Sequence, residues 1–273
     1  MADGPINLSN ATRTNLLALQ RTTSLIANTQ KRLSTGLKVN SAIDNAISYF
    51  QARSLNDRAT DLSNLKDAID QGVSGVETAM NGLESIADLV AQMKGIALAS
   101  KANSNKEDRS RSAVQFNDLR QQLDNLANDS SYKGSNLIKG SPANLKVSFS
   151  EDGSSTLTVS GISSDSSGLS MVVAAANWVD DVNIENAIND LDSALSTLRS
   201  SAATMGSNAA VLSLRLDFTT NMINSLEGGA AKLVNADLNT ESANLLTLQT
   251  RQQLGTIGLS IAQQSEQSIL RLF

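Results

Sequence analysis

The sequence predicts a mainly α-helical protein: an elongated antiparallel helical bundle or coiled coil with its N- and C-terminal helices paired, plus a small β-hairpin element. Three observations lead to this fold class. Apolar residues recur at alternating steps of three and four over long stretches, the 273 residues include only two prolines, and one short stretch alternates apolar with polar residues. Because Pro5 and Pro142 are the only prolines, the rest of the chain is free of the strongest helix breaker.

The clearest helical signal covers residues 184–226. Its spacing alternates four and three without a slip and only one member is polar, which is typical of a coiled-coil seam. At about 1.5 Å per residue, a helix over this stretch is roughly 65 Å long. The seam consists of Ile184, Ile188, Leu191, Leu195, Leu198, Ala202, Met205, Ala209, Leu212, Leu216, Thr219, Ile223 and Leu226.

Two further seams precede it. The first consists of Ile69, Val73, Val76, Met80, Leu83, Ala87, Val90 and Ala97, with Lys94 as its one charged member, and the second of Phe116, Leu119, Leu123 and Leu126. Between them, residues 101–111 read KANSNKEDRSR, a charged and turn-prone stretch at which we expect the chain to reverse. Three amphipathic helices of comparable pitch can bury their stripes on one another.

A β-hairpin is predicted before the long seam. Leu145, Val147 and Phe149 alternate with polar residues, the turn signal SEDGSS follows, and residues 156–159 are rich in β-branched side chains. The next stretch, SGISSDSSGLS, is rich in Ser and Gly and predicts a surface loop. An exposed hairpin and loop explain this region better than a ligand site does.

The two ends of the chain share an unusual composition. Residues 6–47 and 236–273 are predicted helical, yet they are poor in charged and aromatic residues. A solvated surface helix normally carries more Lys and Glu, so these helices are expected to pack against other chains and to become ordered mainly on assembly. The candidate assembly-interface residues are Leu16, Leu19, Ile26, Leu33, Leu37, Leu245, Leu248, Leu254, Ile257, Ile261, Ile269, Leu270 and Phe273.

Composition argues against most other classes of protein. Without His or Cys, the usual zinc, iron and copper ligands and the commonest catalytic base and thiol are missing, so we expect no enzyme, no metal and no cofactor. A net charge of −5 with no basic run argues against nucleic acid as a partner. No window approaches ~18 uninterrupted apolar residues, which argues against membrane insertion, and the start lacks the features of a cleaved signal peptide.

These patterns divide the chain into three regions. Residues 1–45 and 232–273 are expected to form a terminal helical polymerisation domain. Residues 46–137 and 183–231 form the predicted helical bundle domain. The remaining residues, 138–182, form the small β-hairpin and outer loop region.

Two stretches carry a family resemblance. Residues 32–46 read RLSTGLKVNSAIDNA, and residues 235–273 read NADLNTESANLLTLQTRQQLGTIGLSIAQQSEQSILRLF. They resemble the N- and C-terminal signatures of bacterial flagellins, with an ending closest to the alphaproteobacterial type. Gly36, Asn40 and Ser41 suit a joint between a terminal helix and the bundle, and Asp44 and Asn45 can cap the next helix.

The resemblance implies a structural subunit that self-assembles into the flagellar filament for swimming motility. It also implies leaderless export through the flagellar type III pathway to an extracellular filament, in which the two ends form an inner tube. The implied partners are other copies of the chain, junction and cap proteins at the filament ends, and an export chaperone on the C-terminal segment. The alternatives are a hook–filament junction protein or another type III-secreted coiled-coil protein.

The sequence departs from the family pattern at two places. Flagellins detected by the mammalian innate-immune receptor have an Arg and a Leu on the first bundle helix and a Glu on the second. The equivalent positions here are Gln92, Ile96 and Asp118, which lack the forked charged donor of Arg. The family's QNR run is replaced by residues 209–211, Ala-Ala-Val.

Overall fold

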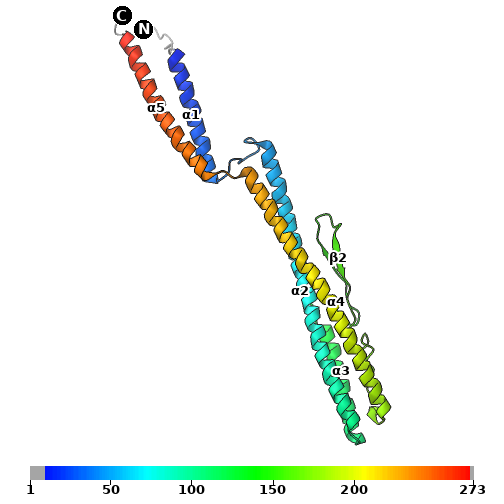
Figure 1. Ribbon diagram of the computed structural model, residues 1–273. Helices are drawn as coiled ribbons and strands as arrows, with labels where there is room; N and C mark the ends of the chain where they lie inside the picture. Colours follow the sequence, from blue (N-terminus) through cyan, green and yellow to red (C-terminus); the bar gives the residue numbers. More distant parts are fainter. Residues whose placement is uncertain (1–9, 271–273) are drawn as a thin grey trace. The chain divides into compact units, whose positions relative to one another are not determined.

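The computed structural model describes residues 10–270, except the side chains of Ala11, Glu266, Ile269 and Leu270. This part of the chain forms five α-helices, one two-stranded sheet and one short 3-10 helix (Figure 1). In chain order they are α1 (Asn10–Thr35), α2 (Ala46–Ala102), α3 (Lys106–Asp129), β1 (Leu145–Ser148), β2 (Thr156–Val159), η1 (Ala175–Trp178), α4 (Asp181–Val234) and α5 (Leu238–Leu270). The predicted fold class is confirmed.

The chain divides into two compact units. The terminal unit comprises the residues up to Arg58 and those from Ser225 onward, and the bundle unit runs from Ala59 to Asn224. Helices α2 and α4 contribute residues to both units.

Helices α2 and α4 run antiparallel in the bundle unit. Lys94 of α2 pairs with Asp192 of α4, and Lys101 pairs with Glu185 at 3.4 Å, so residue numbers rise along one helix as they fall along the other. The seam predicted over residues 184–226 alternates buried and half-buried side chains along its whole length. Its spacing therefore marks the side of α4 that packs on the other helices.

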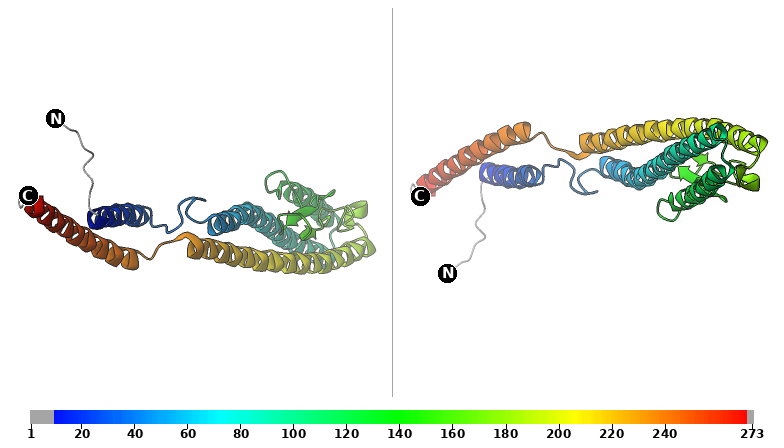
Figure 2. Two further views of the ribbon diagram at one scale, coloured as in Figure 1. Left: turned by 90° about the horizontal axis from the view of Figure 1, so that it is seen from above. Right: turned by 90° about the horizontal axis from the view of Figure 1, so that it is seen from below.

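Helix α3 runs along the other helices of the bundle unit (Figure 2). Its buried residues complete the core, as the seam from Phe116 to Leu126 predicts. The chain reverses before it, where Asn105 caps α3 by accepting a hydrogen bond from the Glu107 N–H at 3.0 Å. Phe116 and Trp178 are fully buried and pack together with ring centroids 4.9 Å apart. This aromatic pair joins α3 to the segment that leads into α4.

The predicted hairpin is present. Strands β1 and β2 pair antiparallel, with Leu145 opposite Val159 and Val147 opposite Leu157. These apolar residues share one face, and Val147 lies so close to Gly72 of α2 that a Cβ there would come within 2.8 Å of its Cγ2. The hairpin therefore packs its apolar face on the bundle.

The stretch after the hairpin is more deeply packed than a surface loop. Ser164, Ser166 and Leu169 are buried, so the expectation of an exposed loop is wrong at these residues. The Asp124 carboxylate accepts hydrogen bonds from the Ser166 N–H at 2.7 Å and from its hydroxyl at 2.9 Å. These bonds let the serine enter the protein interior without an unpaired polar group.

In the terminal unit, α1 and α5 pack as an antiparallel pair (Figure 1). Arg32 pairs with Glu241, Thr23 accepts a hydrogen bond from Gln252, and Leu19 lies against Gly255. The pairing of the terminal helices is thus confirmed. The helix predicted up to residue 47 ends earlier, at Thr35, because Gly36 adopts a left-handed conformation with φ +72°.

Candidate functional site

Helix α5 is apolar on two opposite faces. Gly255, Leu248 and Leu245 lie on the side that meets α1, where Leu19 would contact a Cβ at position 255 at 3.2 Å. On the other side, Leu246, Leu254, Ile257 and Ile261 are 56–67% exposed. At ~100° per residue, these four side chains fall within an arc of roughly 80°. A helix that is apolar on both faces is normally buried on both faces, and α1 covers only one of them.

Helix α1 also has apolar residues on both a covered side and an exposed side. Ile26 is buried, and Leu19 and Leu33 are half-buried. Leu17 and Leu25 are each more than half exposed, and they line a shallow groove with Gln20, Arg21 and Ser24. The described part of the terminal unit therefore has little core on α1 and α5: the buried side chains there are those of Thr12, Ile26, Thr29 and Glu241.

The candidate interface residues fall into three groups. Ile26 is buried, and Leu19, Leu33, Leu37, Leu245 and Leu248 are half-buried. Leu16, Leu254, Ile257 and Ile261 are exposed. The side chains of Ile269 and Leu270, and all of Phe273, lie outside the described residues.

A second exposed apolar patch was not predicted. It comprises Ile43, Ile47 and Phe50 at the start of α2, with Ile43 96% exposed, and Tyr49 packs edge-on against Phe50. These three residues are spaced four and three apart in the sequence. The spacing crosses the start of α2, so it falls within the joint predicted between the terminal helix and the bundle. We call these three residues the connector patch.

The connector between α1 and α2, residues 36–45, is held to the chain between α4 and α5 by backbone hydrogen bonds. The Lys38 N–H donates to the Val234 carbonyl at 2.7 Å, and the Ala236 N–H donates to the Gly36 carbonyl at 2.8 Å. These bonds flank an isolated antiparallel bridge between Leu37 and Asn235. The sequence signals for a joint at Gly36 thus correspond to a defined turn that fixes where α1 and α5 start to pair.

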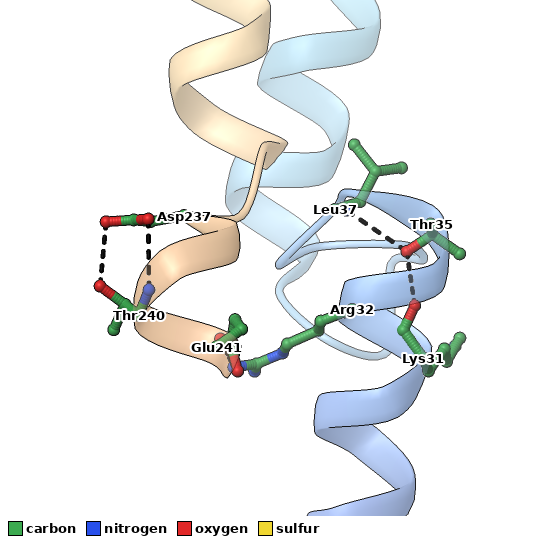
Figure 3. Close-up of polar contacts among 7 residues, drawn as sticks. All are labelled: Lys31, Arg32, Thr35, Leu37, Asp237, Thr240 and Glu241. Atoms are coloured by element: carbon green, nitrogen blue, oxygen red, sulfur yellow. Dashed lines mark hydrogen bonds and ion pairs between the residues drawn. The ribbon is translucent and has the colours of Figure 1, made fainter. Parts of the chain in front are cut away.

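An ion pair lies just beyond this turn (Figure 3). The Arg32 guanidinium on α1 reaches the Glu241 carboxylate on α5 at 3.0 Å, and the Glu241 side chain is only 11% exposed. A nearly buried carboxylate needs such a partner, since removing Arg32 would leave the Glu241 charge uncompensated. The pair therefore favours one register of α1 against α5.

Two aspartates at the same place act as local caps. The Asp237 carboxylate accepts hydrogen bonds from the Thr240 hydroxyl at 2.9 Å and from the Thr240 N–H at 3.3 Å (Figure 3). Together with a bond from the Asn239 N–H at 3.0 Å, they lower its pKa. Asp44 accepts the N–H groups of Asn40 and Ser41, each at 3.0 Å, which also lowers its pKa. Asn45 caps α2 by accepting the Ser48 N–H at 3.0 Å.

These lowered pKa values predict an acid-sensitive connector. A carboxylate with a lowered folded pKa stabilises the fold above its unfolded value, here 3.8, and loses that contribution as pH falls through the folded pKa. We expect helicity measured by circular dichroism at 222 nm to fall as the pH drops below 3.8. Asp44→Asn combined with Asp237→Asn should flatten this step, and an unchanged step would show that other carboxylates cause it.

The described residues contain no grouping of three or more acidic, His or Cys side chains that could hold a metal ion. No helix among them is long and apolar enough to cross a membrane. Gln92 and Asp118, two of the receptor-equivalent positions, are exposed on α2 and α3, and Ile96 is half-buried on α2.

The fold and these surfaces define a class of protein: a helical structural protein whose terminal helices carry exposed apolar residues. Family models for the bacterial flagellin N-terminal and C-terminal helical regions match residues 6–143 and 185–273. Flagellin FljK of Caulobacter vibrioides is 33% identical over the full length of both chains. The chain belongs to the bacterial flagellin family; it is a structural subunit of the flagellar filament, and flagellins are not enzymes.

Other relatives agree with this assignment. A flagellin of Brucella melitensis is 32% identical over 95% of each chain, and flagellin C of Rhizobium meliloti is 27% identical over 90% of this chain and 91% of its own. These alphaproteobacterial flagellins bear out the resemblance of the C-terminal segment. A crystal structure of Bacillus cereus flagellin aligns with a TM-score of 0.48 and 22% identity, covering 57% of this chain and 88% of its own.

Proposed function

We propose that the chain polymerises through its two terminal helical segments. Residues 1–45 and 232–273 form the inner tube of the filament, residues 46–137 and 183–231 form the layer around it, and residues 138–182 lie outermost. The observation that carries this proposal is the second apolar face of α5, which α1 leaves exposed. Neighbouring copies bury that face in the filament, and the gain in buried apolar area drives assembly.

The predicted interface residues take two roles in this proposal. The buried and half-buried group, including Leu19, Ile26 and Leu248, holds α1 against α5 within one copy. The exposed group, Leu254, Ile257 and Ile261 together with Leu16, contacts neighbouring copies. A contact between different surfaces of identical chains does not close on itself and produces a helical polymer.

The sparse core of α1 and α5 supports ordering on assembly. A pair of helices with few buried side chains offsets little of the conformational entropy lost on folding. We infer that both helices open frequently in the monomer and become stable once neighbouring copies cover their exposed faces.

Membership of the flagellin family supports the remaining partners and the location. Junction and cap proteins bind at the ends of the filament, and an export chaperone covers the C-terminal segment before type III export to the cell exterior. The exposed apolar face of α5 is the surface that such a chaperone has reason to shield in the cytoplasm.

A terminal deletion tests the assembly role. Removing residues 1–20 deletes the first turns of α1 and uncovers part of the inner face of α5, so the variant should not extend sheared filament seeds under the electron microscope. The bundle unit contains none of these residues, and its thermal unfolding followed by Trp178 fluorescence should be unchanged. Normal filament growth by the deletion variant would refute the proposal.

The receptor-equivalent positions support a separate prediction. Gln92 cannot offer the planar, charged fork of five N–H donors that an Arg presents to a carboxylate. We therefore expect weak activation of the mammalian flagellin receptor in a reporter-cell assay. Gln92→Arg with Asp118→Glu should raise the response, and a wild-type response as strong as that to an enterobacterial flagellin would contradict the prediction.

A further inference from the structure

An apolar stripe on α4 faces away from the core of the bundle unit. Val211, Leu214 and Phe218 follow the helical steps of three and four and are 41%, 69% and 54% exposed. Leu212 and Thr219, which are buried, lie roughly 80–160° around the same helix from these side chains. Three large apolar side chains in a row on an outer face indicate a contact surface.

A groove lies between α2 and the hairpin of the same unit. It has a volume of about 440 Å³, and apolar side chains of Leu65, Leu137 and Leu145 line it. Gly72 and Gly75 stand one turn apart in its lining and contribute no side chains of their own. The hairpin's own Val147 fills the space at Gly72, since a Cβ there would come within 2.8 Å of it. At Gly75 a Cβ would lie 3.8 Å from Leu145 and Tyr132, which leaves room beside this glycine for a side chain of another molecule.

Charges at the two surfaces are complementary. The lining of the groove includes Lys133 and Lys146 and no acidic residue. The stripe lies in a part of α4, residues 204–224, whose only charged residues are Arg215 and Asp217. Both are exposed, but the Arg215 guanidinium lies 5.1 Å from the centre of the Phe149 ring of its own hairpin. Asp217 is the exposed acidic residue beside the stripe.

The groove and the stripe lie at the same height along the bundle unit but on different sides of it. A Cβ at Gly72, in the groove lining, would lie 3.8 Å from Leu212 of α4, whose side chain points into the core. Around α4, the side chains of the stripe are turned by roughly 100–160° from Leu212. A copy placed beside another can therefore present its stripe to the groove of its neighbour while its own groove stays open for the next copy.

We propose that Val211, Leu214 and Phe218 of one copy seat in the groove between α2 and the hairpin of a second copy, with Asp217 beside Lys146. This contact rests on the proposed function, because it is one of the lateral contacts of the polymer. It involves the bundle unit alone and adds to the contacts made by the terminal helices. Each such contact is small, but every copy in a filament makes it twice, once with its stripe and once with its groove.

Cysteine crosslinking tests this contact in assembled filaments, since the chain has no cysteine of its own. Filaments of the variant Leu214→Cys with Ser135→Cys, which places one thiol on the stripe and one in the groove, are treated with a short bismaleimide. We expect a ladder of covalent multimers on a denaturing gel. Filaments mixed from the two single-cysteine variants should give dimers and nothing larger, and unassembled monomers should give no product.

The matched control moves one cysteine by a single residue. Ser213 is exposed on α4 but points about 120° away from the stripe, so Ser213→Cys with Ser135→Cys should give no ladder. Filaments of normal appearance without a ladder from the Leu214→Cys pair, or with equal ladders from both pairs, would overturn the contact. Failure of the wild-type chain to form filaments would instead count against the proposed function.

Charge reversal gives an independent readout. Asp217→Lys and Lys146→Glu, each alone, should slow seeded filament growth severalfold at low salt, and the double reversal should restore it. The effect should shrink as salt is raised, because these charges lie at the exposed edge of the contact. Additive losses in the double variant would contradict the pairing.

Discussion

Filament growth should stop when the exposed apolar face of α5 is made acidic. Ile257 and Ile261 lie one turn apart on that face and are 56% and 59% exposed. In the monomer, Ile257→Asp with Ile261→Asp leaves both charges in water, so the fold tolerates them. In the filament, the same charges would be buried without partners, at a cost of several kcal/mol each.

The expected result is complete loss of seeded polymerisation, measured by light scattering and electron microscopy, with an unchanged circular dichroism spectrum of the monomer. The matched control is Ile257→Leu with Ile261→Leu, which keeps the apolar surface and should polymerise at close to the wild-type rate. Filaments from the aspartate variant would mean that this face of α5 stays in contact with water after assembly.

The largest loss of stability is expected from the centre of the bundle unit. Phe116 is fully buried between the helices and packs on Trp178. Phe116→Ala removes this contact and leaves a cavity, which should lower the free energy of unfolding by about 3–5 kcal/mol. Trp178 is the only tryptophan of the chain, so urea unfolding followed by its fluorescence reports on the packing that the substitution disturbs.

Val114 supplies the control on the same helix. It is 56% exposed, and Val114→Ala should change the free energy of unfolding by less than about 0.5 kcal/mol. Equal losses from the two substitutions would show that Phe116 is not part of a close-packed core.

The bundle could be predicted from the sequence because its signal is redundant. A buried stripe must repeat at the helical period wherever a helix packs on its neighbours, and the 184–226 seam does so at every position. Lys94 fits this account as well. The seam of α2 accommodates this charged residue because Lys94 pairs with Asp192 of α4. Periodicity alone does not reveal this partner.

The serine-rich segment after the hairpin could not be placed from its composition. Serine is mostly a surface residue, but Ser166 is buried because Asp124 and Arg120, which are over forty residues earlier in the chain, bond to it. Long-range hydrogen bonds of this kind leave no periodic mark in the sequence.

The assembly surface was predicted only in part, for a physical reason. Helix α5 has apolar residues on two opposite faces, so a count of apolar positions finds the residues without separating the inner face from the outer one. The contacts made in the fold, such as the packing of Leu19 against Gly255, distinguish the face that α1 covers from the face that holds Leu254 and Ile257. The connector patch was missed because its spacing crosses a helix start.

Hydrogen exchange measured on the monomer and on the filament tests the assembly role of the terminal helices most directly. Purified monomer is seeded with sheared filaments, and amide exchange in α1 and α5 is compared with exchange in the bundle unit by mass spectrometry. We predict that assembly slows exchange strongly in α1 and α5 and leaves the buried core of the bundle unit unchanged. Protection of α1 and α5 in the monomer equal to that in the filament, or no filaments at all, would contradict the account.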